Sequence, residues 1–232
     1  MRNVSHTKQY TRRLGLAILL LALCTVILVS CVAGPNALWI RGIFGLDVND
    51  YFSEAPIRQL QPNGATAAHL SNIITIVVGD SIRLSPFSGT SEAVNLYRDA
   101  ILNDMLRDDY SRYTGNRQAI DAVASTQPYL SCATLISKSD FENVVFRYFG
   151  GTSVKHKSGS AFSYISRAGY YTSSLQAREC VAEVSILELY ETEHTYRMQF
   201  TLTANGETSN VYTAVFVKRD DGSCYWKALR VI

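Results

Sequence analysis

The four histidines are the first residues to consider for catalysis, because imidazole titrates near neutral pH. They are His6, His69, His156 and His194, each isolated in the sequence from the others and from paired carboxylates. A metal site needs two or more ligands at helical or hairpin spacing, and no such set is present. The motifs of serine hydrolases, dinucleotide-binding folds, P-loop proteins and zinc peptidases are also missing. We therefore predict that the protein is not an enzyme and holds no metal or cofactor.

Paired carboxylates offer a second route to acid–base chemistry. Asp104 and Asp108 lie one helical turn apart, with Asp109 beside them. Such a pair can work as acid and base when burial separates the two pKa values. However, Asp104 stands three residues before Arg107, and Asp108 stands four before Arg112. This spacing favours ion pairs on a solvated helix face.

Tyrosine is frequent, with 14 in the chain, and three of them cluster at Tyr164, Tyr170 and Tyr171. Tyrosine suits interfaces because it joins apolar area to a hydrogen-bonding tip. We take this cluster as a candidate interface, with packing inside the core as the alternative.

Three helices and a sheet would position these residues. Apolar residues at helical spacing predict helices from Thr90 to about Tyr113, from Arg117 to about Ser125, and from Ser139 to Phe149. Residues 150–176 show no clear period and are expected to be loop. Four strands are predicted at Glu179–Glu191, Thr195–Thr203, Asn210–Lys218 and Cys224–Ile232.

Alternation in the second of these strands places Met198, Phe200 and Leu202 on one face. Asn205-Gly206 and Asp221-Gly222 are hairpin signals, so the four strands should form an antiparallel meander. Helices followed by such a sheet give an α+β fold with the helices covering one sheet face.

Residues Leu14–Gly34 form an uncharged apolar run of 21 residues, which as a helix would span roughly 30 Å, the thickness of a bilayer core. The charged residues in the segment before this run are all basic: Arg2, Lys8, Arg12 and Arg13. By the positive-inside rule this flank stays cytosolic. The pattern predicts a single-pass bacterial inner-membrane protein whose N-terminus is cytosolic and whose C-terminal domain is periplasmic.

A cleaved signal is the alternative interpretation of the same run. Leu28-Val29-Ser30-Cys31 fits the lipobox pattern, in which Cys31 becomes the acylated first residue of an envelope lipoprotein. The apolar run continues past Cys31, which favours a retained anchor.

The net charge of the chain beyond the apolar run indicates which classes of partner it can bind. Four of the 22 basic residues and none of the 20 acidic ones precede the apolar run, so the remainder carries a formal charge of −2. With no basic stripe, we expect no nucleic-acid binding.

The predicted organisation is a cytosolic tail at 1–13, a transmembrane helix at 14–34, a linker at 35–89 and a domain at 90–232. Within the linker, Ile73–Val78 and Ser81–Leu84 flank Gly79-Asp80 and read as a short hairpin. Beyond the anchor, Cys132, Cys180 and Cys224 allow at most one disulfide, and ordinary buried thiols are the alternative.

This layout resembles the VirB8-like inner-membrane subunits of bacterial type IV secretion and conjugation systems. The similarity lies in Tyr97–Asn116 (YRDAILNDMLRDDYSRYTGN), in Leu135–Phe141, and in the closing segments Asn210–Lys218 and Trp226–Val231. The chain lacks the Asn-Pro that often precedes the family's last strand, and it carries the extra apolar segment at 73–84.

The resemblance implies an NTF2-like periplasmic domain, with helices packed on a curved four-stranded antiparallel sheet. It also implies a non-enzymatic assembly subunit that contacts the membrane, further copies of itself and other secretion-channel subunits, with no small-molecule substrate. The alternatives are the envelope lipoprotein acylated at Cys31 and an anchored NTF2-like ligand-binding domain.

Overall fold

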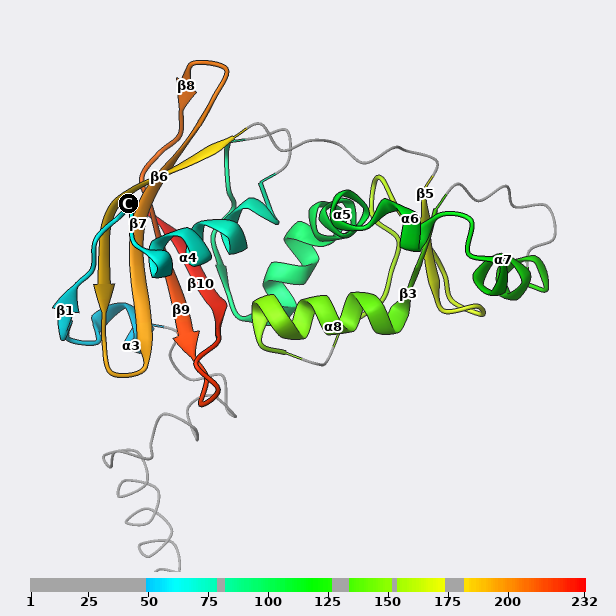
Figure 1. Cartoon of the computed structure of the whole chain (residues 1–232), viewed down its shortest axis with the longest axis horizontal. Coiled ribbons are helices and arrows are strands. Elements are labelled where there is room, and N and C mark those ends of the chain that lie inside the picture. The colour runs from blue at the N-terminus through cyan, green and yellow to red at the C-terminus, as the bar shows by residue number, and fades with distance from the viewer. Residues whose placement is uncertain (1–48, 79–81, 127–133, 152–153, 174–181) are drawn as a thin grey trace, which may run out of the picture. The chain divides into compact units, whose positions relative to one another are not determined.

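The computed structural model describes residues 49–78, 82–126, 134–151, 154–173 and 182–232 (Figure 1). The helices are α3 (Asn49–Ser53), α4 (Ala65–Thr75), α5 (Thr90–Asp108), α6 (Tyr110–Tyr113), α7 (Arg117–Ala124) and α8 (Lys138–Phe149). The strands are β1 (Arg58–Gln59), β2 (Phe87–Ser88), β3 (Thr134–Ser137), β4 (Ser163–Ile165), β5 (Tyr170–Ser173), β6 (Glu183–Glu191), β7 (Thr195–Ala204), β8 (Glu207–Thr208), β9 (Tyr212–Lys218) and β10 (Cys224–Val231). Residues Asp50–Ile232 form one compact unit.

The larger sheet has seven strands in the order β1-β6-β7-β9-β10-β2, with β8 paired to β7 and every pair antiparallel. Strand β7 shows the predicted alternation, since Met198, Phe200 and Leu202 are fully buried. It turns into β8 at Asn205-Gly206, where both residues have positive φ (52° and 80°). Positive φ at both central positions is what a tight hairpin turn needs, so this hairpin prediction is confirmed.

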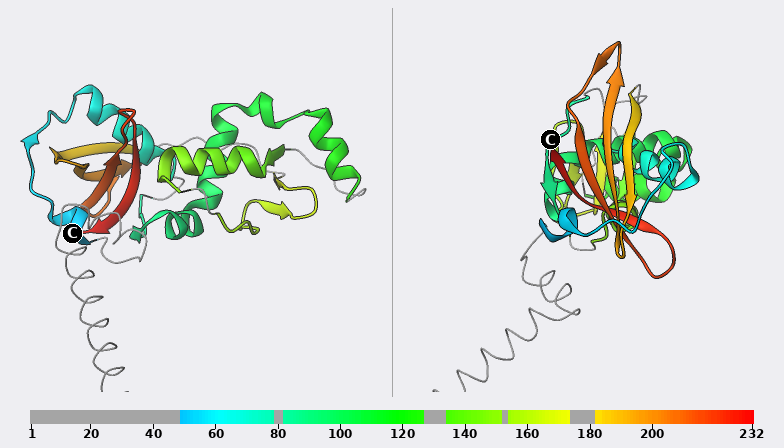
Figure 2. Two further views of the ribbon diagram at one scale, coloured as in Figure 1. Left: turned by 90° about the horizontal axis from the view of Figure 1, so that it is seen from below. Right: turned by 90° about the vertical axis from the view of Figure 1, so that its left-hand side faces the viewer.

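One core joins this sheet to helices α4, α5 and α8. In the right-hand view of Figure 2 the helices α5–α8, in green, lie behind its strands. Trp226 on β10 is fully buried, with the rings of Phe87, Phe149 and Phe216 centred 5.1, 6.3 and 5.7 Å away. Its indole N–H donates to the Ala228 carbonyl at 2.9 Å, so the buried polar atom is satisfied.

A second sheet has three strands in the order β3-β5-β4. It packs against α7 through a separate small core of Ala119, Val123, Leu135 and Ile165. This sheet positions β5 beside α8, which matters for the tyrosine cluster described below.

Residues 51–60 are fastened to the larger sheet. The Glu54 carboxylate accepts hydrogen bonds from the Thr192 hydroxyl at 2.5 Å and the Thr195 hydroxyl at 3.0 Å. Arg197 donates to the Phe52 carbonyl at 2.6 Å. These bonds hold the segment at the turn between β6 and β7, where β1 then pairs with β6.

The predicted fold class is wrong in its sheet. The four predicted strands correspond to β6, β7, β9 and β10, but they belong to a seven-stranded sheet accompanied by a three-stranded one, not to a curved four-stranded NTF2-like sheet. The extra strands β1, β2 and β8 have two residues each, too short to show alternation in the sequence. Residues 150–176, expected to be loop, contribute β4 and β5.

The hairpin predicted at Ile73–Leu84 is also wrong. Ile73 and Ile74 belong to helix α4, whose buried residues Ala67, Leu70, Ile73 and Ile74 recur at helical spacing. A short β-branched run can lie in a strand or in a buried helix. Here Ala67 and Leu70, upstream of the run, continue its helical spacing and place it in a helix.

No helix within the described residues is long and apolar enough to cross a membrane. This finding contradicts the expected localisation, a single-pass inner-membrane protein with a periplasmic domain. The predicted span Leu14–Gly34, like Cys31, lies outside the described residues.

Candidate functional site

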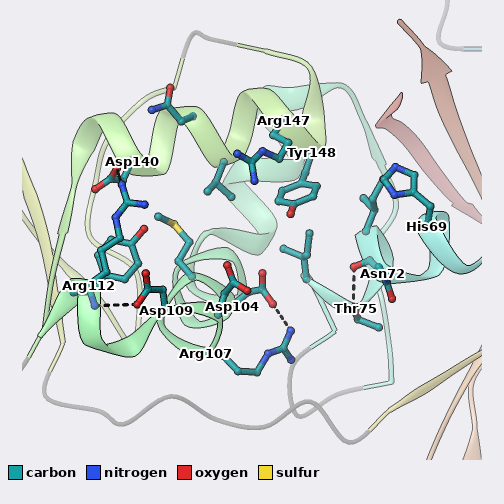
Figure 3. A pocket seen from close by; sticks show the side chains of 17 residues that line it. His69, Asn72, Thr75, Asp104, Arg107, Asp109, Arg112, Asp140, Arg147 and Tyr148 are labelled. Carbon is teal, nitrogen blue, oxygen red and sulfur yellow. Dashed lines mark hydrogen bonds and ion pairs between the residues drawn. The ribbon is translucent and has the colours of Figure 1, made fainter. Parts of the chain in front are cut away.

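A cleft of about 690 Å³ lies between α4, the α5–α6 corner and α8 (Figure 3). Its volume falls in the range of ligand pockets, about 300–1,000 Å³. Ile73, Met105 and Val144 contribute apolar side chains to its lining. Charged and amide side chains from all three walls complete the lining, among them Asp104 on α5 and Arg147 on α8.

Local sequence sets the position of each wall. Helix α5 ends at Asp108, because Asp109 leaves helical geometry (φ −144°, ψ 73°). The Asp109 carboxylate then accepts from the Arg112 backbone N–H at 3.1 Å and caps α6. Ser137 caps α8 by accepting from the Asp140 N–H at 3.0 Å. Gly150, in the left-handed region at φ 77°, ends that helix.

Two ion pairs lie along the cleft. Arg107 pairs with Asp104 on the same helix, as the spacing predicted. Arg112 pairs instead with Asp140 on α8, at 2.6 Å, and not with Asp108 as predicted. The chain bends at Asp109, so positions 108 and 112 are not one turn apart on a continuous helix.

Burial perturbs the acidic wall of the cleft. The Asp104 side chain is only 15 % exposed, and burial raises the pKa of its carboxyl above the usual range. The Arg107 guanidinium opposes this rise in pKa, whereas the neighbouring Asp108 charge adds to it. Burial also raises the pKa of Tyr113, with the Asp140 charge in support. Asp104 is therefore not on a fully solvated face.

Three cleft side chains keep unused binding capacity. Within the described residues, Asp108 on α5 and His69 on α4 make no side-chain hydrogen bond or ion pair across the cleft. Arg147 on α8 lies over the Tyr148 ring at 6.0 Å, and both are labelled in Figure 3. A cation and an anion thus stand on different walls, each exposed. Chemically, the cleft can bind a partner that brings charges of both signs.

The predicted tyrosine interface lies on the smaller sheet, on strands β4 and β5. Tyr171 is fully buried, and its ring is centred 4.8 Å from that of Tyr164. Tyr164 and Tyr170 are half-buried. Tyr171 therefore has no surface for a partner in this structure, and an interface through this cluster stays a prediction for the other two residues.

Tyr171 belongs instead to a polar network that no sequence spacing revealed. The imidazole of His156 lies between Tyr171 and Glu142, with its Nδ1 2.9 Å from the Tyr171 hydroxyl and its Nε2 3.0 Å from the Glu142 carboxylate. The three residues come from β5, the loop after α8, and α8 itself. The sequence separations of 14 and 15 residues match no catalytic motif.

Cys224 is the one candidate disulfide residue among those described. It is a free and buried thiol, and burial raises its pKa to about 11, against the effect of the Arg219 charge. Cys132 and Cys180 lie outside the described residues, so their pairing stays a prediction. Across the described ranges, no group of three or more His, Cys, Asp or Glu side chains could hold a metal ion.

Comparison of the chain with protein-family models, with curated proteins and with solved structures found no match.

Proposed function

We propose that the protein acts by non-covalent contact, binding a segment of a partner polypeptide in the cleft between α4, α5 and α8. The observation that carries this proposal is the exposed, opposite charge on facing walls: Asp108 on α5 and Arg147 on α8. Charge of both signs at a contact steers encounter and fixes the register of the partner.

The dimensions suit a short extended segment. The α8 wall runs from Asp140 to Tyr148, which at 1.5 Å per residue is about 12 Å. An extended chain rises about 3.3 Å per residue, so three to four residues would span this wall.

The lining favours a polypeptide over a small molecule. Small-ligand pockets are mostly apolar with a few polar groups, whereas protein interfaces combine an apolar centre with a charged rim. Here Ile73, Met105 and Val144 belong to the apolar part, and charged side chains make up much of the remaining lining. A small zwitterionic ligand is the alternative, favoured only by the cavity volume.

The resemblance to VirB8-like subunits implied the same mode of action, assembly through protein contacts. Because the sheet is not the expected four-stranded one, we take from that resemblance neither a secretion system nor a location. A second copy of this chain or another subunit remains a candidate source of the bound segment.

A random peptide library displayed against the full chain tests the proposal. Peptides enriched on the wild type should bind Asp108→Lys and Arg147→Glu about fivefold more weakly, since a charged contact at an interface rim typically contributes about 1 kcal/mol. Peptides with the complementary charge reversed should recover binding to the matching variant.

Asp121→Lys and Arg117→Glu are matched controls, because these exposed side chains lie on α7, outside the cleft, and pair only at 3.8 Å. They should bind the enriched peptides like the wild type. Enrichment that ignores both cleft variants would contradict the proposal. So would a library of small zwitterions that shifts the melting temperature through these two residues while no peptide binds.

A further inference from the structure

The outer edge of strand β6 has a neighbouring strand along only part of its length. Strand β1 pairs with Tyr190 and Glu191 alone, and the Leu60 N–H donates to the Leu189 carbonyl at 2.8 Å. Along Glu183–Glu188, β7 is the only strand that pairs with β6 within the described residues, and it lies on the other side. The backbone N–H and C=O groups of such an edge can pair with an added strand.

A β-bulge determines how charge is arranged along this edge. Glu183 lies opposite Thr203 of β7. Glu188 lies opposite Gln199, and Leu187 is the extra residue of the bulge. Thr203 and Gln199 are four positions apart on β7, so the two glutamates point to the same face of the sheet. Without the bulge, residues five positions apart on one strand would point to opposite faces.

The two faces of the edge differ in polarity. Val184 and Ile186 point toward the core, because they lie opposite the fully buried Leu202 and Phe200 and pack against the core themselves. The two glutamates of the edge point to the other face. Within the described residues neither carboxylate makes an ion pair or a side-chain hydrogen bond, whereas Glu191 farther along β6 pairs with two cations.

We propose that the edge at Glu183–Glu188 binds an extended, basic segment of a partner polypeptide, which adds a strand to the sheet beside β6. The segment carries lysine or arginine at its first and fifth positions, opposite the two glutamates. Its second and fourth positions are apolar, because they point to the same face as Val184 and Ile186. The pattern is the same in both chain directions, so it holds for parallel and antiparallel pairing.

Strand β1 already occupies the adjoining part of the edge in this manner. The Arg58 guanidinium pairs with the Glu191 carboxylate at 2.5 Å, and the Ile57 N–H donates to the Glu191 carbonyl at 2.8 Å. An extended segment with a basic side chain therefore fits the neighbouring positions of the same strand. Glu183–Glu188 continue this acidic edge for about 20 Å, since a strand rises about 3.3 Å per residue.

The same charges disfavour a second copy of the chain at this edge. Pairing two copies of β6 would bring four glutamates onto one face, and like charges on neighbouring strands repel. A basic partner removes this repulsion. Leu187, 48 % exposed at the bulge, adds an apolar contact for the incoming segment.

A nine-residue synthetic peptide tests the proposal on the full chain. Its central five residues are lysine, valine, threonine, valine and lysine, and glycine and serine flank them. Fluorescence anisotropy should show saturable binding to the wild type. Glu183→Lys and Glu188→Lys should each weaken it about fivefold, since an exposed ion pair contributes up to about 1 kcal/mol. A peptide with glutamate in place of both lysines should bind the double variant and not the wild type.

Glu193→Lys is the matched control, because it makes the same charge change at the β6–β7 turn, where the side chain is 77 % exposed and lies off the edge. It should bind the peptide like the wild type. Asp108→Lys and Arg147→Glu should do the same, because the cleft has no lining residue in β6. The test is therefore independent of the proposed function, and either proposal can fail while the other stands.

Backbone N-methylation of the peptide separates strand addition from simple charge attraction. Alternate N–H groups of an extended chain point to opposite sides, so methylating one alternate set should abolish binding and methylating the other should leave it. Saturating peptide should also slow hydrogen exchange of amides within 183–188 about tenfold. Absence of binding, equal weakening by Glu193→Lys, or equal effects of the two methylated sets would overturn the inference. So would a wild-type dimer in sedimentation that protects the same amides.

Discussion

Replacing Tyr171 by Phe tests the buried network most directly, because it removes one oxygen atom and keeps the ring in the core. The change leaves the buried His156 Nδ1 without its partner, the Tyr171 hydroxyl. A buried group without its hydrogen bond costs about 1–3 kcal/mol. Since one buried nitrogen loses its partner, we expect a total loss of about 1–3 kcal/mol in the free energy of unfolding.

Urea unfolding followed by far-ultraviolet circular dichroism measures this loss. For a domain of this size each kcal/mol lowers the melting temperature by about 2–4 °C. The slope of the free energy against urea should stay unchanged, because the exposed surface of the unfolded chain is the same.

Tyr164→Phe is the matched control for the same measurement. Tyr164 packs beside Tyr171, but its hydroxyl makes no hydrogen bond within the described residues, so its removal should change stability by less than about 0.5 kcal/mol. Equal effects of the two substitutions would refute the reasoning, since the hydroxyl of Tyr171 would then carry no special role.

Alkaline pH gives the same substitution a second readout. Burial raises the pKa of Tyr171 to about 12, while the Arg98 charge opposes the shift. A pKa raised in the folded state means that this stability is fully present below about pH 10 and is lost as the pH rises through about 12. Tyr171→Phe should therefore lose less stability than the wild type across that interval, in urea titrations at each pH.

Local patterns predicted much of the secondary structure correctly. Alternation along Thr195–Thr203 and the Asn205-Gly206 turn located β7 and its hairpin, and helical spacing located α5, α7 and α8. These signals are local, because they depend on side chains two to four residues apart. The assembly of the sheet is not local: β1 and β2 reach it from 58–59 and 87–88 and carry no pattern of their own.

The candidate site shows the same limit. Spacing placed Asp104 and Asp108 on one helix face and paired Asp104 with Arg107 correctly. It could not show that Asp140 would take Arg112, because α6 and α8 meet only through the tertiary fold. His156 looked isolated for the same reason, since its partners on α8 and β5 are near only in space.

Three further substitutions or modifications probe the core and the turns. Gly150→Ala should destabilise the fold by about 1–3 kcal/mol more than Gly222→Ala in urea unfolding. Both glycines have positive φ, so both substitutions strain the backbone, but only a Cβ at position 150 would lie 2.4 Å from the Tyr225 ring. Phe200→Ala, at a fully buried position, should cost about 3–5 kcal/mol in the same assay, and a loss below about 1 kcal/mol would contradict its place in the core. Cys224 should resist iodoacetamide at about pH 8, because the thiolate is the nucleophile and burial raises the thiol pKa to about 11. Peptide mass spectrometry separates its alkylation from that of the other cysteines. At pH 8 the Cys224 rate in the folded chain should be about a hundredfold below the rate in urea, and it should climb as the pH approaches 11. Equal rates in the folded and the urea-unfolded chain would show that the thiol is accessible, and would remove the buried environment from which the raised pKa follows.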